Sequence, residues 1–225
     1  MLPTLQMRQA SRALLARFSE LARMLGWRLP WIAIVWLIRP KFLVLVRDLS
    51  QPLPPGQPYS VTRQSVLTEA EIEAIAAINE RMTPTEVRRR LADGQVCHLE
   101  WVGSALAHYR WEVTRLTYIP YLHRTFHPRA GQVLGDLVFT APSFRGRGID
   151  SFAAVTALHR MRTEGLREAI SIIAWWNSVE LRVSRRRWGT SVVGAIGYWN
   201  LGLKRRYFAE GAVRLDSPSS FCIDG

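Results

Sequence analysis

A basic, glycine-containing turn at residues 143–150 has the composition of a phosphate-binding loop. Gly146 and Gly148 let the backbone bend so that successive N–H groups converge on phosphate oxygens. Arg145 and Arg147 supply charged donors for the same group. These residues predict an anion cradle that binds a phosphorylated ligand. An ordinary exposed turn between a strand and a helix is the alternative.

The elements on either side of the turn would hold it in place. Val133–Thr140 is rich in branched residues and predicts a strand, which Ala141-Pro142 ends. A helix opens in the turn and continues to about Thr163, before Gly165 stops it. Because a helix N-terminus carries a partial positive charge, this helix strengthens the expected anion site.

The alternation of strand and helix extends along the chain. Ala169–Trp176 predicts a second strand, Asn177 lies at its end, and Ser178–Arg187 predicts a basic helix. Thr68 and Thr83 have the chemistry of helix N-caps. The other expected elements are helices at about 69–80 and 84–92, strands at 96–102 and 105–113, and a final hairpin of 191–199 and 207–213.

Composition limits the class of protein. The chain has 225 residues and a mass of 25.7 kDa, with 48% hydrophobic and 21% charged residues, which excludes a disordered chain and suits one domain plus about fifty residues. A net charge of +12 and a pI near 10.9 predict an anionic partner. No motif that reads nucleic acid is visible, so we expect none as partner. Cys97 and Cys222 fit neither a disulfide framework nor a zinc site, which favours a reducing compartment.

The basic charge is concentrated in residues 1–50, where eight basic and two acidic side chains give a net charge of +6. The apolar run Trp31–Ile38 is too short to cross a bilayer, which needs roughly 20 helical residues. We therefore expect a basic amphipathic arm that lies on an anionic membrane surface, with the protein peripheral on the cytoplasmic side. The alternative is a helix that packs on its own domain or on the partner of a homodimer. Gln51–Tyr59 predicts a Pro-rich connection to a domain at residues 60–225.

Two spaced patterns in residues 60–215 carry a family resemblance. Arg145-Gly146-Arg147-Gly148-Ile149 follows a strand, while Asn177 ends the next strand and is followed by a helix and Gly189. This region resembles the GCN5-related N-acetyltransferase (GNAT) superfamily, whose motif is [Gln/Arg]-x-x-Gly-x-[Gly/Ala]. Thr190 stands where the family has Phe or Tyr. The resemblance implies an α/β fold: a mixed, mostly antiparallel sheet flanked by helices, with a central parallel pair that diverges to admit a thioester.

The resemblance also implies acyl-CoA as co-substrate. The diphosphate would rest on main-chain N–H groups of residues 145–150, and the pantetheine arm would hydrogen-bond the strand before the turn. Asp150 departs from the motif, since a carboxylate beside a diphosphate is unfavourable; the arginines would offset it, or its side chain would cap the helix and point away. The expected CoA-binding residues are Val138, Phe139, Thr140, Arg145, Gly146, Arg147, Gly148, Ile149, Asp150 and Asn177.

Transfer of an acyl group to an amine needs a base for the amine and a proton for the leaving thiolate. Asp136, two residues before Val138, is the first candidate for the base, because histone-acetylating relatives carry a Glu at a similar place; a strand-end carboxylate paired with Arg is the alternative. Glu112, His108 and Glu100 are weaker candidates. The family's usual acid, a Tyr, falls near Ser184. Tyr198 would substitute for it, unless it is simply a packed aromatic.

The acceptor is an amine in both catalytic versions of this prediction. Residues 114–131 predict a long irregular connection that lines a substrate entrance. His123 and His127 lie there without further ligands nearby, so we expect no metal. The expected substrate-binding residues are Glu112, Tyr118, Tyr121, His123 and His127.

Three features favour a lipid acceptor: the basic, Trp-bearing N-terminal arm, the aromatic connection Tyr118–Phe126 and the high net charge. Bacterial ceramide synthases are similar in general plan, joining an acyl-CoA to a sphingoid base, and the basic arm suits an amine that rests in a leaflet. An amino sugar or nucleotide sugar for a surface polysaccharide is the second prediction. A membrane-associated module that has lost catalysis is the third.

Overall fold

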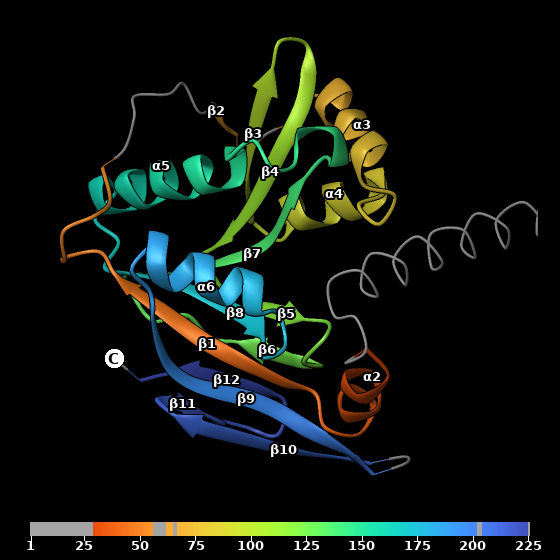
Figure 1. The fold of residues 1–225 in the computed structure, drawn as a ribbon, viewed down its shortest axis with the longest axis vertical. Helices are drawn as coiled ribbons and strands as arrows, with labels where there is room; N and C mark the ends of the chain where they lie inside the picture. Colours follow the sequence, from red (N-terminus) through yellow and green to blue (C-terminus); the bar gives the residue numbers. More distant parts are fainter. Residues whose placement is uncertain (1–28, 56–61, 65–66, 202–203, 225) are drawn as a thin grey trace, which may run out of the picture. The chain divides into compact units, whose positions relative to one another are not determined.

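The structure is a computed structural model that describes residues 29–55, 62–64, 67–201 and 204–224 (Figure 1). The chain divides into two compact units, one of residues 1–40 and 198–206 and one of residues 41–197 and 207–225. The basic stretch before residue 29, which the sequence predicts to be an amphipathic helix, lies outside the described residues.

An eight-stranded sheet has the order β10-β9-β1-β8-β7-β4-β3-β2. Strands β7 and β8 pair in parallel, whereas the other pairings from β9 across to β2 are antiparallel, as predicted. The strands are β1 (Lys41–Asp48), β2 (Thr62–Gln64), β3 (Val96–Val102), β4 (Ala105–Val113), β7 (Gln132–Thr140), β8 (Glu168–Ala174), β9 (Ser191–Leu201) and β10 (Lys204–Gly211).

The helices begin where the sequence places caps. Thr68 and Glu71 form a reciprocal capping box at α3, and the Thr83 side chain accepts from the Glu86 N–H at α4. Both helices pack against the β3–β4 hairpin (Figure 1), where Trp111 and Tyr109 are fully buried. The helices are α2 (Leu29–Ile38), α3 (Glu69–Ile78), α4 (Pro84–Ala92), α5 (Ile149–Thr163) and α6 (Ser178–Arg187), with a short 3-10 helix η2 (Pro142–Phe144).

The prediction of an irregular connection over residues 114–131 is wrong. Two strands, β5 (Thr117–Ile119) and β6 (Arg124–Phe126), lie in it and join β11 (Val213–Arg214) and β12 (Ser220–Ile223) in a second sheet of order β11-β12-β6-β5. The physical reason is that its apolar side chains have a core of their own. Phe126 is buried against a phenylalanine of β12, with ring centroids 5.3 Å apart. The predicted strand at 207–213 is also divided, between β10 and β11.

Residues 1–50 are not one arm, because β1 lies inside the sheet between β8 and β9. Val44 and Leu45 are fully buried. A strand buried on both faces is a continuous apolar run rather than an alternating one. In the sequence, the apolar residues of β1 therefore resemble a continuation of the apolar run Trp31–Ile38. Residues 51–55 of the predicted connection have no regular structure, and the rest of it lies outside the described ranges.

Strands β7 and β8 separate halfway along their length. Their parallel pairing runs from Gln132 opposite Glu168 to Gly135 opposite Ser171. Beyond that point β7 stays paired with β4 as far as Thr140, while β8 stays paired with β1. The predicted divergence of a central parallel pair is confirmed.

Candidate active site

A groove of about 880 Å³ lies where β7 and β8 separate, a size that suits an organic ligand. It runs from the turn after η2 to the first turn of α6. Among the expected CoA-binding residues, all but Arg147 line it. The lining residues used below are Phe42, Arg110, Tyr121, Asp136, Val138, Phe139, Thr140, Arg145, Gly146, Gly148, Ile149, Asp150, Asn177 and Glu180.

The glycine turn is open toward this groove. Gly146 and Gly148 have φ of 76° and 77°, which favour glycine, and a Cβ at either would meet no atom within 4 Å. Gly148 caps α5 without any side-chain hydrogen bond, so the N–H groups of the first turn of α5 are not satisfied by a cap there. The Arg145 Nε donates to the Thr140 carbonyl at 3.2 Å. These features are what an anion cradle requires.

Arg147, predicted to bind CoA, does not line the main groove. It lines a neighbouring groove of about 530 Å³ together with Glu100 and Phe152. Its guanidinium lies over the Phe144 ring, 5.3 Å from the centroid. Its side chain is therefore placed outside the larger groove that holds the other predicted CoA contacts.

Two carboxyl groups and a guanidinium share the inner wall of the main groove. Asp150 comes from α5, Glu180 from α6 and Arg110 from β4. Burial raises the pKa of Asp150, although Arg110 opposes this. Burial, with the charge of Asp150 adding to it, raises the pKa of Glu180 to about 7. Asp150 thus lines the groove and makes no side-chain cap hydrogen bond at α5, so it does not act as the helix cap.

The structure places Asp136 where it could be a general base, and it also pairs Asp136 with an arginine, which was the alternative prediction. It lines the groove, and its Oδ2 accepts from the Arg90 Nη1 at 2.7 Å. Arg90 also donates to Glu86 at 3.0 Å and to Gln95 at 3.0 Å, so the guanidinium is fixed by several partners. The ion pair orients the Asp136 carboxylate within the groove.

A β-bulge lies at the same place. Arg110 is opposite Val138 and Glu112 is opposite Gly135, so one residue of β4 faces two of β7, Asp136 and Leu137. A bulge leaves the extra residue outside the ladder and re-aims its neighbours, and bulges are frequent beside active sites. No sequence pattern indicated it.

Tyr121, expected to bind substrate, also lines the groove. Its ring packs on Phe42 with centroids 4.8 Å apart. Burial raises the pKa of its hydroxyl, and the charge of Asp136 adds to the effect. The hydroxyl therefore stays protonated and is a hydrogen-bond donor at neutral pH.

Glu112, predicted to bind substrate, lies in a buried ion pair. Glu112 is buried and accepts from Arg160 at 2.6 Å. Burial alone would raise its pKa, but the hydrogen bond and charge of His98, with Arg160 and Arg110, hold the pKa at about 2. Glu112 lies on β4 and forms a buried ion pair with Arg160 of α5, and its role as a substrate contact stays a prediction.

Tyr118, His123, His127 and Ser184 do not line this groove, and their site roles stay predictions. The Tyr118 hydroxyl lies 3.4 Å from the His123 Nδ1, and His127 lies 3.4 Å from Asp216, all outside the groove lining. Ser184 lies in α6, where it is fully buried, and it does not line the groove. Tyr198 falls in the other compact unit, buried beside Arg205, and its role as an acid stays a prediction.

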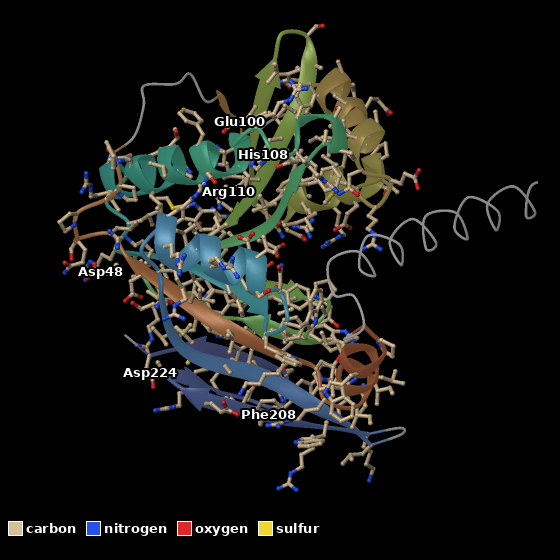
Figure 2. All side chains as sticks on the ribbon, in the orientation of Figure 1. Asp48, Glu100, His108, Arg110, Phe208 and Asp224 are labelled. Carbon is tan, nitrogen blue, oxygen red and sulfur yellow. The ribbon has the colours of Figure 1, made fainter. Side chains whose placement is uncertain are left out.

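Two weaker candidates for the base, Glu100 and His108, lie on the β3–β4 hairpin, as does Arg110 (Figure 2). His108 is buried, with its Nδ1 2.9 Å from the Thr140 Oγ1, and burial lowers its pKa to about 3. Burial raises the pKa of Glu100 to about 7. Neither lines the main groove.

Asn177 has a structural role beside its position in the groove. Its Oδ1 accepts from the Glu180 N–H at 3.3 Å and so caps α6. No group of three or more His, Cys, Asp or Glu side chains in the described part of the chain could hold a metal ion. Among the same residues, no helix has the length and apolarity needed to cross a membrane.

The sheet order, the divergent parallel pair and the groove define the fold of the GNAT acyltransferases. A putative acetyltransferase of the GNAT family from Novosphingobium aromaticivorans is similar at a TM-score of 0.52 and 15% identity, over 71% of this chain and 62% of that one. A tandem GNAT protein from the clavulanic acid biosynthesis pathway is similar at 0.50 and 14%, over 68% and 50%. The chain thus matches less than two thirds of either protein's length. No family model and no curated protein matches the sequence.

Proposed function

We propose that the protein is an acyl-CoA-dependent N-acyltransferase. The observation that carries the proposal is a single groove that joins an open glycine cradle to a bulged strand bearing Asp136. The N–H groups at Gly148–Asp150 would hold the diphosphate of CoA, and the strand edge at Val138–Thr140, which β8 has left, would accept the pantetheine amides as an added strand. CoA supplies the acyl group as an activated thioester.

The groove provides the groups that acyl transfer needs. The Asp136 carboxylate, oriented by Arg90, would take a proton from the ammonium of the acceptor, and the neutral amine would then attack the thioester carbonyl. A main-chain N–H released at the bulge would donate to the thioester oxygen as negative charge develops on it. The neutral Tyr121 hydroxyl would donate to the leaving sulfur, in place of the buried Ser184.

The test is release of free CoA thiol from acetyl-CoA and palmitoyl-CoA, each offered with sphingoid bases and with amino sugars. We expect turnover with the long-chain donor and a sphingoid base. Turnover of acetyl-CoA with sugars alone would replace the lipid acceptor by the sugar acceptor. If neither donor turns over and CoA does not bind in calorimetry, the protein is a non-catalytic module with this fold.

The lipid acceptor is supported by an apolar surface in the first compact unit. Helix α2 leaves Trp31, Ile34 and Leu37 exposed, at 66%, 52% and 71% of their area. The side-chain amide of Asn200 donates to the Leu37 carbonyl at 2.6 Å and ties α2 to the end of β9. This apolar surface comprises Trp31, Ile34, Leu37, Ile38, Trp199 and Leu201.

Basic side chains accompany the apolar surface. The Arg39 guanidinium lies over the Trp199 ring at 4.7 Å, and Lys204, Arg205 and Arg206 are exposed on the next strand. Exposed tryptophans beside cations suit the interface of an anionic leaflet, where an amphiphilic amine is found. We place the protein on the cytoplasmic face for this reason and because acyl-CoA is expected in that compartment.

Replacing Trp31 and Leu37 together with serine should weaken binding to vesicles that contain phosphatidylserine by about tenfold or more, because two large apolar side chains no longer enter the interface. Sedimentation with vesicles at low and high salt measures this. Leu116→Ser is the control, since Leu116 is 62% exposed in the other unit. Equal sedimentation of all three proteins would refute membrane binding through this surface.

A further inference from the structure

The neighbouring groove of about 530 Å³, which Arg147 lines, meets the main groove at the start of α5. Gly148, Ile149 and Ser151 line both grooves, so a ligand group held at the glycine turn can extend into either one. The volume of the neighbouring groove suits a nucleoside. Its other lining residues used below are Glu100, Trp101 and Phe152.

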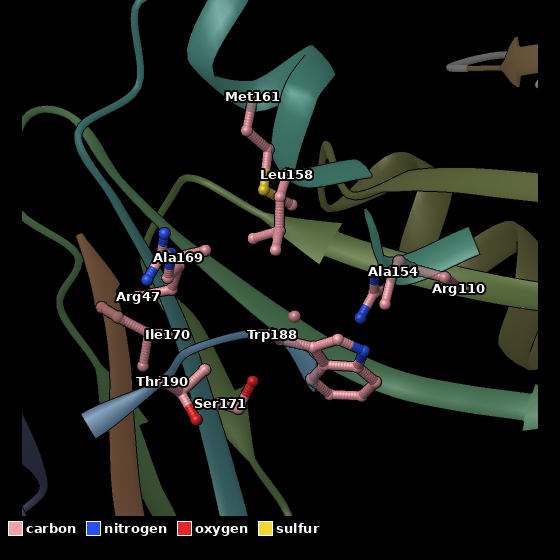
Figure 3. Close-up of a pocket in the computed structure, with 11 residues that line it drawn as sticks. Arg47, Arg110, Ala154, Leu158, Met161, Ala169, Ile170, Ser171, Trp188 and Thr190 are labelled. Atoms are coloured by element: carbon pink, nitrogen blue, oxygen red, sulfur yellow. The ribbon is translucent and has the colours of Figure 1, made fainter. Parts of the chain in front are cut away.

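The shared turn is held in place by the rest of α5. Leu158 and Met161 of α5 are buried against the sheet, and together with Ile170 of β8 they line a cavity of only about 20 Å³ (Figure 3). Such a cavity has room for little more than one water molecule, so α5 lies close against the strands. The N–H groups at its start therefore have a fixed place between the two grooves.

The neighbouring groove contains a buried carboxyl group without a partner. Glu100 is 6% exposed, yet it forms no hydrogen bond or ion pair among the described residues, and Arg110 and Asp150 influence it only through their charges. Its oxygens are not sealed from solvent, and the neighbouring groove is by far the larger of the two cavities that Glu100 lines. Because an unsatisfied buried polar group costs about 1–3 kcal/mol, this carboxyl group indicates a ligand that donates to it.

The chemistry of the groove selects an adenine nucleotide. Trp101 and Phe152 offer ring surfaces that suit the faces of a flat base. The Glu100 carboxyl can accept from an amine, and burial raises its pKa to about 7, so near neutral pH it is partly protonated and can also donate to a ring nitrogen. Adenine carries an amine and an acceptor nitrogen side by side on one edge. Arg147 is exposed and supplies a cation for a phosphate.

We propose that the neighbouring groove binds the 3′-phosphoadenosine end of CoA, with Glu100 on the amine edge of adenine and Arg147 on the 3′-phosphate. The inference rests on the proposed function and adds the residues that recognise the nucleotide. The diphosphate lies at the shared turn, between the adenosine in this groove and the pantetheine arm in the main groove. Arg147 thus contacts CoA from outside the main groove.

Calorimetric titration of the full chain with CoA tests the place of the adenine. Glu100→Leu should lower the affinity about tenfold or more, because leucine has a similar size but cannot pair with the base. Glu100→Gln should keep most of the affinity, since an amide also accepts from an amine and donates to a ring nitrogen. Unchanged affinity in Glu100→Leu would overturn the proposal, and equal losses in both variants would give Glu100 a structural role instead. If the native chain does not bind CoA, the proposed function fails as well, so the two failures are distinguishable.

A pair of ligands tests the place of the 3′-phosphate. Arg147→Gln should lower the affinity for CoA about fivefold and that for 3′-dephospho-CoA about twofold or less, because only CoA carries this phosphate. Arg162→Gln is the matched control, since Arg162 is exposed near the other end of α5 and lines neither groove. An equal loss for both ligands would overturn the assignment of Arg147. A crystal structure of the native chain with CoA whose adenine lies outside the neighbouring groove would overturn the whole proposal.

Discussion

Gly148→Glu should lower the affinity for CoA by about a hundredfold or more while the protein still folds. A carboxylate about 4 Å from a phosphate charge is unfavourable by about 4 kcal/mol at an effective dielectric of 20, and roughly half of that remains at an exposed turn after screening. Since the diphosphate carries more than one charge, a hundredfold loss is a conservative expectation. Calorimetric titration with CoA measures it.

Gly165→Glu is the control for the backbone. Gly165 has φ of 80°, close to the 77° of Gly148, and a Cβ there also meets no atom within 4 Å. It lies beyond the other end of α5. Both variants should therefore lose a similar 1–2 kcal/mol of stability through left-handed strain, and only Gly148→Glu should lose CoA. Unchanged CoA affinity in Gly148→Glu would show that the diphosphate does not bind at this turn.

Asp136→Asn should lower kcat by about 10²–10⁴, the range that general base catalysis usually contributes. The amide keeps the size of the carboxylate but cannot take a proton from the ammonium. The rate lost by the variant should recover in part at high pH, where more of the amine acceptor is already neutral. Steady-state rates from pH 6 to pH 10 with the donor and acceptor that turn over measure both effects.

Glu86→Gln separates catalysis from structure. Glu86 also accepts from Arg90, at 3.0 Å, but does not line the groove. Both variants remove one carboxylate from the Arg90 guanidinium and should lose comparable stability. Equal kcat values in Asp136→Asn and Glu86→Gln would mean that Asp136 is only the ion-pair partner of Arg90 and not the general base.

Local signals in the sequence predict most elements well. The N-caps at Thr68 and Thr83 fix the starts of α3 and α4, and the glycine turn fixes the start of α5. The divergence of β7 and β8 followed from the family resemblance rather than from residue patterns. These features depend on a few neighbouring residues, which is why a single sequence reveals them.

Features that depend on distant partners were missed. The run Lys41–Asp48 has the composition of a buried strand or of a membrane-seeking segment, and only its pairing with β8 and β9 decides between them. Glu112 is a candidate for a general base or a substrate contact by residue type, and only the fold reveals that Arg160 of α5 pairs with it. The bulge at Asp136 arises from the register of β4 against β7, which no local pattern encodes.

The place of β1 in the sheet has a consequence for how the protein is made. Phe42 pairs with Ala174 on one side and with Ile196 on the other, so the ribosome releases this strand long before its neighbours exist. Such non-local pairing is slow, and an unpaired apolar strand invites association with other chains. The pairing of β1 with β9 therefore has to wait until residues 191–201 have been synthesised.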